Sequence, residues 1–128
     1  MEQKDKNLLL KDLCARLPYG VKCDVGDNKP YTLSRMEIDD NNGHLLDFIE
    51  MKNGLDMQVY LSEVKPYLFP MSSMTEEQKK EYDNLNCWEL GCFPHTEEAL
   101  DYLIANNFDY RGLIPMGLAI DATGLNIY

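Results

Sequence analysis

Two Asn-Gly pairs, Asn42-Gly43 and Asn53-Gly54, constrain the fold most, because each lies between segments of strand-like composition. Asn-Gly readily supplies the positive φ angles that a tight β-hairpin turn requires. The segments around these pairs are 20–25, 31–38, 44–51 and 55–61. We therefore expect residues 19–64 to form a small antiparallel β-meander, or a barrel-like sheet.

The second of these segments shows a break in its alternation of apolar and polar residues. Tyr31 and Leu33 are in phase with each other, whereas Met36 and Ile38 have moved by one position. A shift of this kind indicates a β-bulge between Leu33 and Met36.

A helix is expected before the sheet. Leu9, Leu10, Leu13 and Leu17 recur at spacings of three and four, and the proline at position 18 marks the stop. Residues 1–18 are thus a predicted helical segment. A leucine-bearing helix, either this one or one after the sheet, is expected to cover the apolar face of the sheet. Cys14 on this segment is expected in the core.

Residues 65–128 are expected to hold a proline-containing crossover and two or three helices. Pro66 and Pro70 favour an extended segment outside the sheet. Thr75 with Gln78 forms a predicted capping box, and Thr96 is a predicted N-cap for the next helix, which ends at positions 106–107. The chain is therefore interpreted as one α+β domain spanning residues 1–128.

The segment 108–120 is expected to be a tight, largely buried turn structure. Pro115 lacks an amide donor, and Gly112 and Gly117 would each cost a helix about 1 kcal/mol. Bends are expected at the two glycines. The apolar side chains of this segment are expected in the core; they are Leu113, Ile114, Met116, Leu118 and Ile120.

The charge of the chain limits its partners. Twelve basic and 22 acidic residues give a net charge of −10, spread over both halves of the sequence. This charge disfavours direct binding to nucleic acid or to anionic membranes, and favours a protein partner with a basic surface. No apolar run approaches the ~20 residues that cross a bilayer, and the first residues do not resemble a signal peptide. A cytoplasmic location is expected.

The sequence gives only weak support for metal binding or covalent catalysis. Cys87, Cys92 and His95 are the best metal candidates, but their spacing differs from that of structural zinc sites and no fourth ligand is near. A loop with two packed cysteines is favoured. His44 and His95 are the only histidines, and the paired carboxylates are explained by turns and helix first turns. We expect no catalytic residues, no metal and no cofactor.

Arg111 lies among aromatic residues and is the only Lys or Arg after Lys80. One interpretation is a binding site for an anionic or planar group, formed by Phe108, Tyr110 and Arg111 with Tyr67 as a further aromatic. The other, which we favour, is a structural pair between Arg111 and a carboxylate that pins the segment to the fold.

Three blocks, residues 9–22, 63–77 and 108–119, resemble segments of a family of short, uncharacterised proteins from gut bacteria and their phages or mobile elements. The three blocks are distinctive and are spread across most of the chain. It implies a phage or mobile-element setting, and it implies no activity and no site residues.

Two functional hypotheses follow. The first is a non-enzymatic acidic interaction module that binds a host or phage protein. The alternative is a small-ligand-binding protein or hydrolase with a pocket between the sheet and the C-terminal helices. The sequence does not indicate the oligomeric state.

Overall fold

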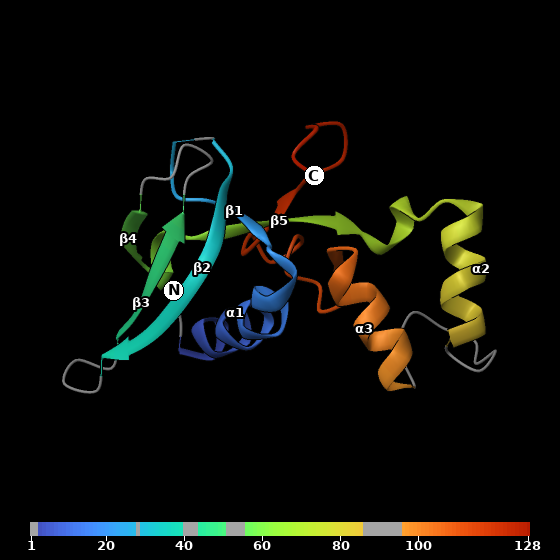
Figure 1. Cartoon of the computed structure of the whole chain (residues 1–128), viewed down its shortest axis with the longest axis horizontal. Coiled ribbons are helices and arrows are strands. Elements are labelled where there is room, and N and C mark those ends of the chain that lie inside the picture. The colour runs from blue at the N-terminus through green and yellow to red at the C-terminus, as the bar shows by residue number, and fades with distance from the viewer. Residues whose placement is uncertain (1–2, 28, 40–43, 51–55, 86–95) are drawn as a thin grey trace.

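The computed structural model describes residues 3–27, 29–39, 44–50, 56–85 and 96–128, and it is an α+β fold (Figure 1). Short 3-10 helices cover Leu17–Tyr19, Leu61–Glu63 and Met71–Ser73. The helices are α1 (Gln3–Arg16), α2 (Glu76–Leu85) and α3 (Glu97–Ala105). The strands are β1 (Lys22–Asp24), β2 (Tyr31–Asp39), β3 (His44–Glu50), β4 (Asp56–Tyr60), β5 (Lys65–Pro70), β6 (Phe108–Asp109) and β7 (Ile120–Asp121).

The first four strands form the expected antiparallel meander. β1 pairs with β2, β2 with β3 and β3 with β4, all antiparallel. The register of β2 against β3 shifts between Leu33 and Arg35, which confirms the predicted bulge. The two Asn-Gly turns lie outside the described residues.

The expectation that 65–70 leaves the sheet is wrong. β5 is an interior strand: the order is β4-β3-β2-β1-β5-β6, and β7 also pairs with β5. β5 is antiparallel to β1 and parallel to β6 and β7, so the sheet is open and mixed and extends beyond residue 64.

The prolines are tolerated because residues between them make the hydrogen bonds. The Phe69 amide donates to the Asn107 carbonyl at 2.8 Å, and the Leu68 carbonyl accepts from the Ala122 amide at 2.8 Å. Pro66 and Pro70 stand at the second and last positions of β5, and a proline retains its carbonyl acceptor.

The helix starts are confirmed. Thr75 N donates to Gln78 Oε1 at 2.9 Å and Gln78 N to Thr75 Oγ1 at 3.2 Å, which is the reciprocal capping box. Thr96 Oγ1 accepts from the Ala99 amide at 3.0 Å. α3 ends at Ala105, and Asn107 has a left-handed φ of 62°.

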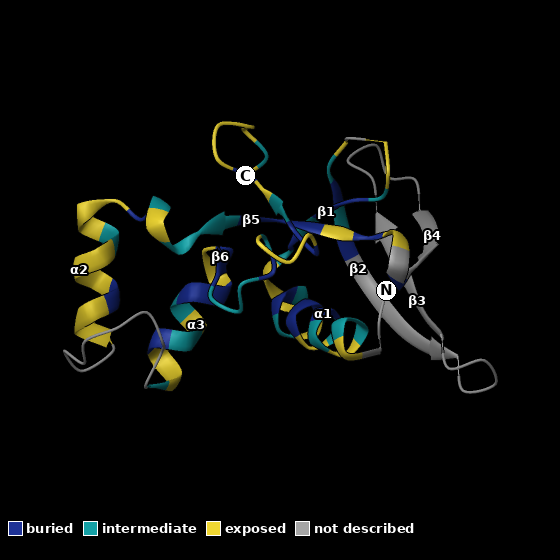
Figure 2. Ribbon diagram, turned by 180° about the vertical axis from the view of Figure 1, so that it is seen from behind, coloured by how far each residue is buried: buried dark blue, intermediate teal, exposed yellow. Residues whose placement is uncertain are grey.

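Two apolar clusters hold the fold together (Figure 2). In the larger one α1 covers the sheet, with Leu9 and Leu13 packed in one cluster with residues of β1, β2 and β5. Cys14, on the other side of α1, is exposed, so its predicted place in the core is wrong. The smaller cluster joins α2, α3 and β6 at the far end of β5; it contains Met74, Tyr82, Ala99, Leu103 and Phe108.

Within the segment 108–120, for which an irregular structure is predicted, residues 110–119 form an irregular stretch between β6 and β7. Gly112 and Gly117 have φ angles of 78° and 77°, so the backbone bends at both glycines. Leu113 and Leu118 are buried. Met116 is 45% exposed, which contradicts its predicted burial, because it lies with Pro115 and Gly117 at the outer tip of the turn.

None of the helices within the described ranges has the length and apolar character needed to cross a membrane.

Candidate functional site

Arg111 takes part in a buried ion cluster that links distant parts of the chain. Its Nε lies 3.2 Å from Asp12 Oδ1. The other oxygen, Asp12 Oδ2, accepts from Arg16 Nε at 2.8 Å. The Asp12 and Arg16 side chains are fully buried, and that of Arg111 is 18% exposed. One carboxylate on α1 thus serves two guanidinium groups.

Arg16 also connects α1 to β6. Its Nη2 donates to the carbonyl oxygen of Phe108 at 2.6 Å. The Tyr110 ring lies close to both guanidinium groups, with its centroid 4.7 Å from Cζ of Arg111 and 5.8 Å from Cζ of Arg16. Such distances allow cation–π attraction. Burial raises the pKa of Tyr110, and the charge of Arg111 opposes that rise.

Asp109 fixes the turn that follows β6. Its Oδ1 accepts from the Leu113 amide at 2.8 Å and its Oδ2 from the Ile114 amide at 2.9 Å. The residue is buried, at 7% exposure. This role is not among those predicted from the sequence, although an Asp three residues before a glycine is a recognisable turn signal.

The structure therefore shows the Arg111–carboxylate pair that the structural interpretation predicts, with Asp12 as the carboxylate. It brings Tyr110 and Arg111 together. The Phe108 ring belongs to the smaller apolar cluster. Tyr67 is buried on β5, and its carbonyl accepts from the Tyr128 hydroxyl at 2.7 Å. A binding role for these residues stays a prediction.

The metal candidates Cys87, Cys92 and His95 lie outside the described residues. Within the described ranges, no three His, Cys, Asp or Glu side chains are grouped in a way that could hold a metal ion.

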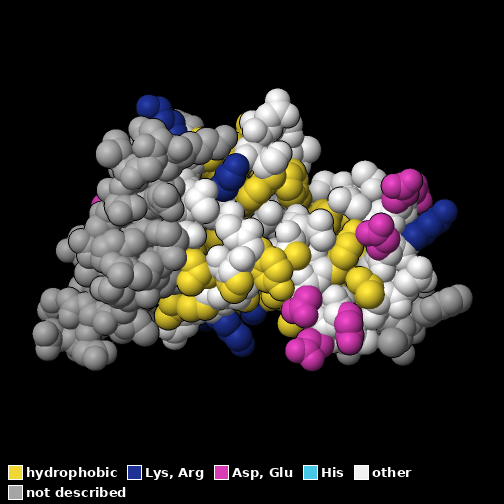
Figure 3. All heavy atoms as spheres, in the orientation of Figure 1, with side chains coloured by type: hydrophobic (Ala, Val, Ile, Leu, Met, Phe, Trp, Pro, Cys, Tyr) yellow, Lys and Arg dark blue, Asp and Glu magenta, His cyan; other side chains and the backbone are white. Residues whose placement is uncertain are grey.

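The α2–α3 end of the molecule carries an acidic surface. Figure 3 shows acidic side chains gathered over these helices. The exposed carboxylate residues there are Glu76, Glu77, Glu81, Asp83, Glu97, Glu98 and Asp101. We call these residues the acidic helix surface. Lys79 and Lys80 are exposed on α2 and offset part of this charge.

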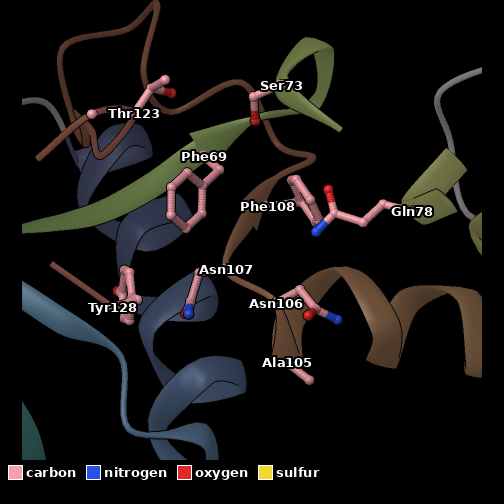
Figure 4. A pocket seen from close by; sticks show the side chains of 10 residues that line it. Phe69, Ser73, Gln78, Ala105, Asn106, Asn107, Phe108, Thr123 and Tyr128 are labelled. Atoms are coloured by element: carbon pink, nitrogen blue, oxygen red, sulfur yellow. The ribbon is translucent and has the colours of Figure 1, made fainter. Parts of the chain in front are cut away.

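Beside this surface is a pocket of about 440 Å³ (Figure 4). It lies where β5, the start of α2, the end of α3 and the segment 123–128 meet. Its lining residues are Phe69, Ser73, Gln78, Ala105, Asn106, Asn107, Phe108, Thr123, Gly124 and Tyr128. We call this the amide pocket, because three of its lining side chains are amides.

Several walls of the amide pocket are fixed by hydrogen bonds. Tyr128 Oη donates to the Tyr67 carbonyl and accepts from the Lys22 amide at 2.9 Å. Burial raises the pKa of Tyr128 well above its usual range. Asn106 Nδ2 donates to the Tyr102 carbonyl at 2.8 Å. Asn107 Oδ1 is buried and has no hydrogen-bond partner within the described part of the chain.

Comparison of the chain with protein-family models, with curated proteins and with solved structures finds no match. The resemblance to short proteins of gut bacteria and their phages stays a prediction.

Proposed function

We propose that the protein is a cytoplasmic, non-enzymatic interaction module whose acidic helix surface docks on a basic surface of a partner protein. The observation that supports this most is the exposure of carboxylates along both α2 and α3. Opposite charge on a partner accelerates encounter and excludes acidic competitors. A host or phage protein is the proposed partner, in keeping with the phage or mobile-element setting that we predict.

The arginines near the aromatic segment support the same assignment. Arg16 is fully buried and Arg111 is paired with Asp12, so both guanidinium groups serve the interior of the fold. The two guanidinium groups that an anionic ligand would need are thereby engaged within the fold, and on α2 and α3 the exposed carboxylates outnumber the exposed lysines.

The test is a pulldown from bacterial lysate with immobilised protein at low and high salt. Charge-driven docking weakens as salt rises, because the screening length falls from about 30 Å at 0.01 M to about 8 Å at 0.15 M. We expect a discrete partner that is retained at low salt and released at high salt.

A pair of matched variants locates the surface. Asp83→Asn with Glu98→Gln neutralises two carboxylates of the acidic helix surface. Asp5→Asn with Glu63→Gln makes the same change of charge on α1 and on the 3-10 helix at Leu61–Glu63. Asp5 and Glu98 both lie in helix first turns, so their effects on helix stability are comparable.

We expect the first variant to lose partner retention and the second to keep it. Equal retention by the two variants, or the absence of any salt-sensitive partner, would contradict the proposal.

A further inference from the structure

The amide pocket has the size of a small-molecule site. Its volume of about 440 Å³ falls within the roughly 300–1,000 Å³ that such sites enclose. Segments from four regions of the chain, around positions 69–78, 105–108, 123–124 and 128, converge on it. Convergence of this kind holds the lining side chains in a fixed arrangement.

The lining favours an uncharged ligand. The described residues around the pocket include no Asp, Glu, Lys, Arg, His or Cys. An ion that enters would lose hydration without gaining a charged partner, which is costly. Of the three hydroxyl side chains in the lining, Ser73 Oγ already donates to the Pro70 carbonyl at 2.6 Å and Tyr128 Oη to the Tyr67 carbonyl at 2.7 Å. No base among the lining residues could activate these hydroxyls, so the lining favours binding over hydrolysis.

The aromatic walls favour a flat ligand. The Phe69 ring centroid lies 6.3 Å from that of Phe108 and 5.8 Å from that of Tyr128, with tilted planes. A planar ring gains stacking and edge contacts against such walls. Flat heteroaromatic compounds therefore fit better than flexible aliphatic ones.

The amide side chains set the orientation in which a ligand can bind. Gln78 Oε1 accepts from the Thr75 amide, which leaves the NH₂ group of this pocket-lining side chain to donate to a ligand. Asn107 Oδ1 lacks a partner among the described residues, and a buried carbonyl without a hydrogen bond is unfavourable. Asn107 lines the pocket and rotation about its χ2 is soft, so an N–H donor of a ligand could turn this oxygen towards itself. The pocket thus offers an N–H donor from Gln78 and a carbonyl acceptor from Asn107. A complementary ligand carries an acceptor beside a donor on one edge.

We propose that the amide pocket binds a small, uncharged, planar compound that carries an N–H donor beside a carbonyl acceptor, such as a heteroaromatic amide or lactam. This proposal is independent of docking through the acidic helix surface.

The experiment is calorimetric titration of the full chain with four probes. Nicotinamide and uracil carry the required edge. Nicotinate replaces the amide by a carboxylate, and 1,3-dimethyluracil lacks N–H donors. We expect saturable one-to-one binding of nicotinamide, uracil or both, with the matching analogue at least about fivefold weaker, the factor expected for one net hydrogen bond. Binding of neither amide at millimolar concentration, or equal binding of nicotinate and nicotinamide, would overturn the proposal.

Asn107→Gly tests the assigned residue without disturbing the backbone. Asn107 has a φ of 62°, a conformation that glycine adopts readily, so removal of its amide should leave the fold intact. Asn126 has a φ of 54°, is exposed and does not line the pocket, so Asn126→Gly is the matched control. Asn107→Gly should weaken probe binding roughly fivefold to tenfold, and Asn126→Gly should leave it unchanged.

Gln78→Glu gives an independent check. Glutamate retains the acceptor of the capping box, so α2 should still begin at Glu76. It loses both N–H donors and adds a negative charge to the pocket. We expect weaker binding of both amides at an unchanged melting temperature. Wild-type affinity in both Asn107→Gly and Gln78→Glu would overturn the assignment of the pocket.

Discussion

Asp12 is the residue on which the buried ion cluster depends. It accepts hydrogen bonds from Arg16 at 2.8 Å and from Arg111 at 3.2 Å. Asp12→Asn would leave a fully buried guanidinium group without its counter-charge. We expect a loss of about 3–5 kcal/mol in the free energy of unfolding, measured by urea denaturation.

The control for Asp12 lies on the same helix. Asp5→Asn makes the same substitution in the first turn of α1 and should cost at most about 1 kcal/mol. If Asp12→Asn costs no more than this control, the cluster does not hold the fold together.

Arg111 contributes less, because its side chain is partly exposed. Arg111→Ala removes the ion pair with Asp12 and the contact with Tyr110. We expect the free energy of unfolding, measured by thermal unfolding, to fall by about 1–2 kcal/mol. Arg111→Lys should recover only part of this, because lysine lacks the planar fork that bonds the carboxylate and stacks on the ring. An unchanged melting temperature in Arg111→Ala would contradict a structural role.

The sequence indicates that Arg111 pairs with a carboxylate, but it does not identify which one. Arg111 and Asp12 are 99 positions apart, and the chain offers 22 acidic residues. The choice depends on how α1 packs against β6, which is a property of the folded chain.

The turn after β6 depends on Asp109. Asp109→Ala removes the acceptor of one buried and one part-buried backbone amide, and we expect a loss of about 3 kcal/mol in the free energy of unfolding, measured by thermal or urea unfolding. Asp109→Asn keeps one oxygen and should cost less. Asp121 bonds the exposed Thr123 amide at 2.9 Å, so Asp121→Ala is a solvent-exposed control that should cost less than about 1 kcal/mol. Equal losses for Asp109→Ala and Asp121→Ala would contradict this role.

The contact between α2 and α3 gives the protein a pH dependence. Burial, and then a hydrogen bond to Glu81, raise the pKa of Tyr102 to about 12. An unfolded tyrosine titrates near 10, so the unfolded state releases its proton first as pH rises. The contribution of Tyr102 to stability is complete below about pH 10 and is lost as pH rises towards 12.

Denaturation curves between pH 8 and 12 test this expectation. Tyr102→Phe cannot titrate, so its stability should fall less over this range than that of the wild type. Parallel profiles for the two proteins would contradict the contribution of Tyr102.

Elements whose causes are local could be predicted from the sequence, and those set by pairing at a distance could not. The caps at Thr75 and Thr96 involve side chains within three residues, and the bulge near Leu33 is visible in the alternation. The place of β5 depends on partners around positions 23, 108 and 120. Local proline rules therefore gave the wrong answer for this strand.

At the scale of the molecule, the buried charges and the acidic helix surface lie in separate places. The buried cluster of Asp12, Arg16 and Arg111 ties α1 to the segment after β6. The carboxylates of the acidic helix surface lie on α2 and α3, beside the smaller apolar cluster and the amide pocket. The sequence indicated an acidic chain, but its charge is spread along both halves, so the acidic helix surface becomes apparent only when α2 and α3 pack together.

One paired measurement tests this separation most directly. Arg111→Ala and the double variant Asp83→Asn with Glu98→Gln are compared for melting temperature and for partner retention at low salt. We predict that Arg111→Ala melts at a lower temperature and retains the partner, whereas the double variant loses the partner with little change in melting temperature. The reverse result, in which Arg111→Ala keeps its melting temperature but loses the partner, would contradict the account.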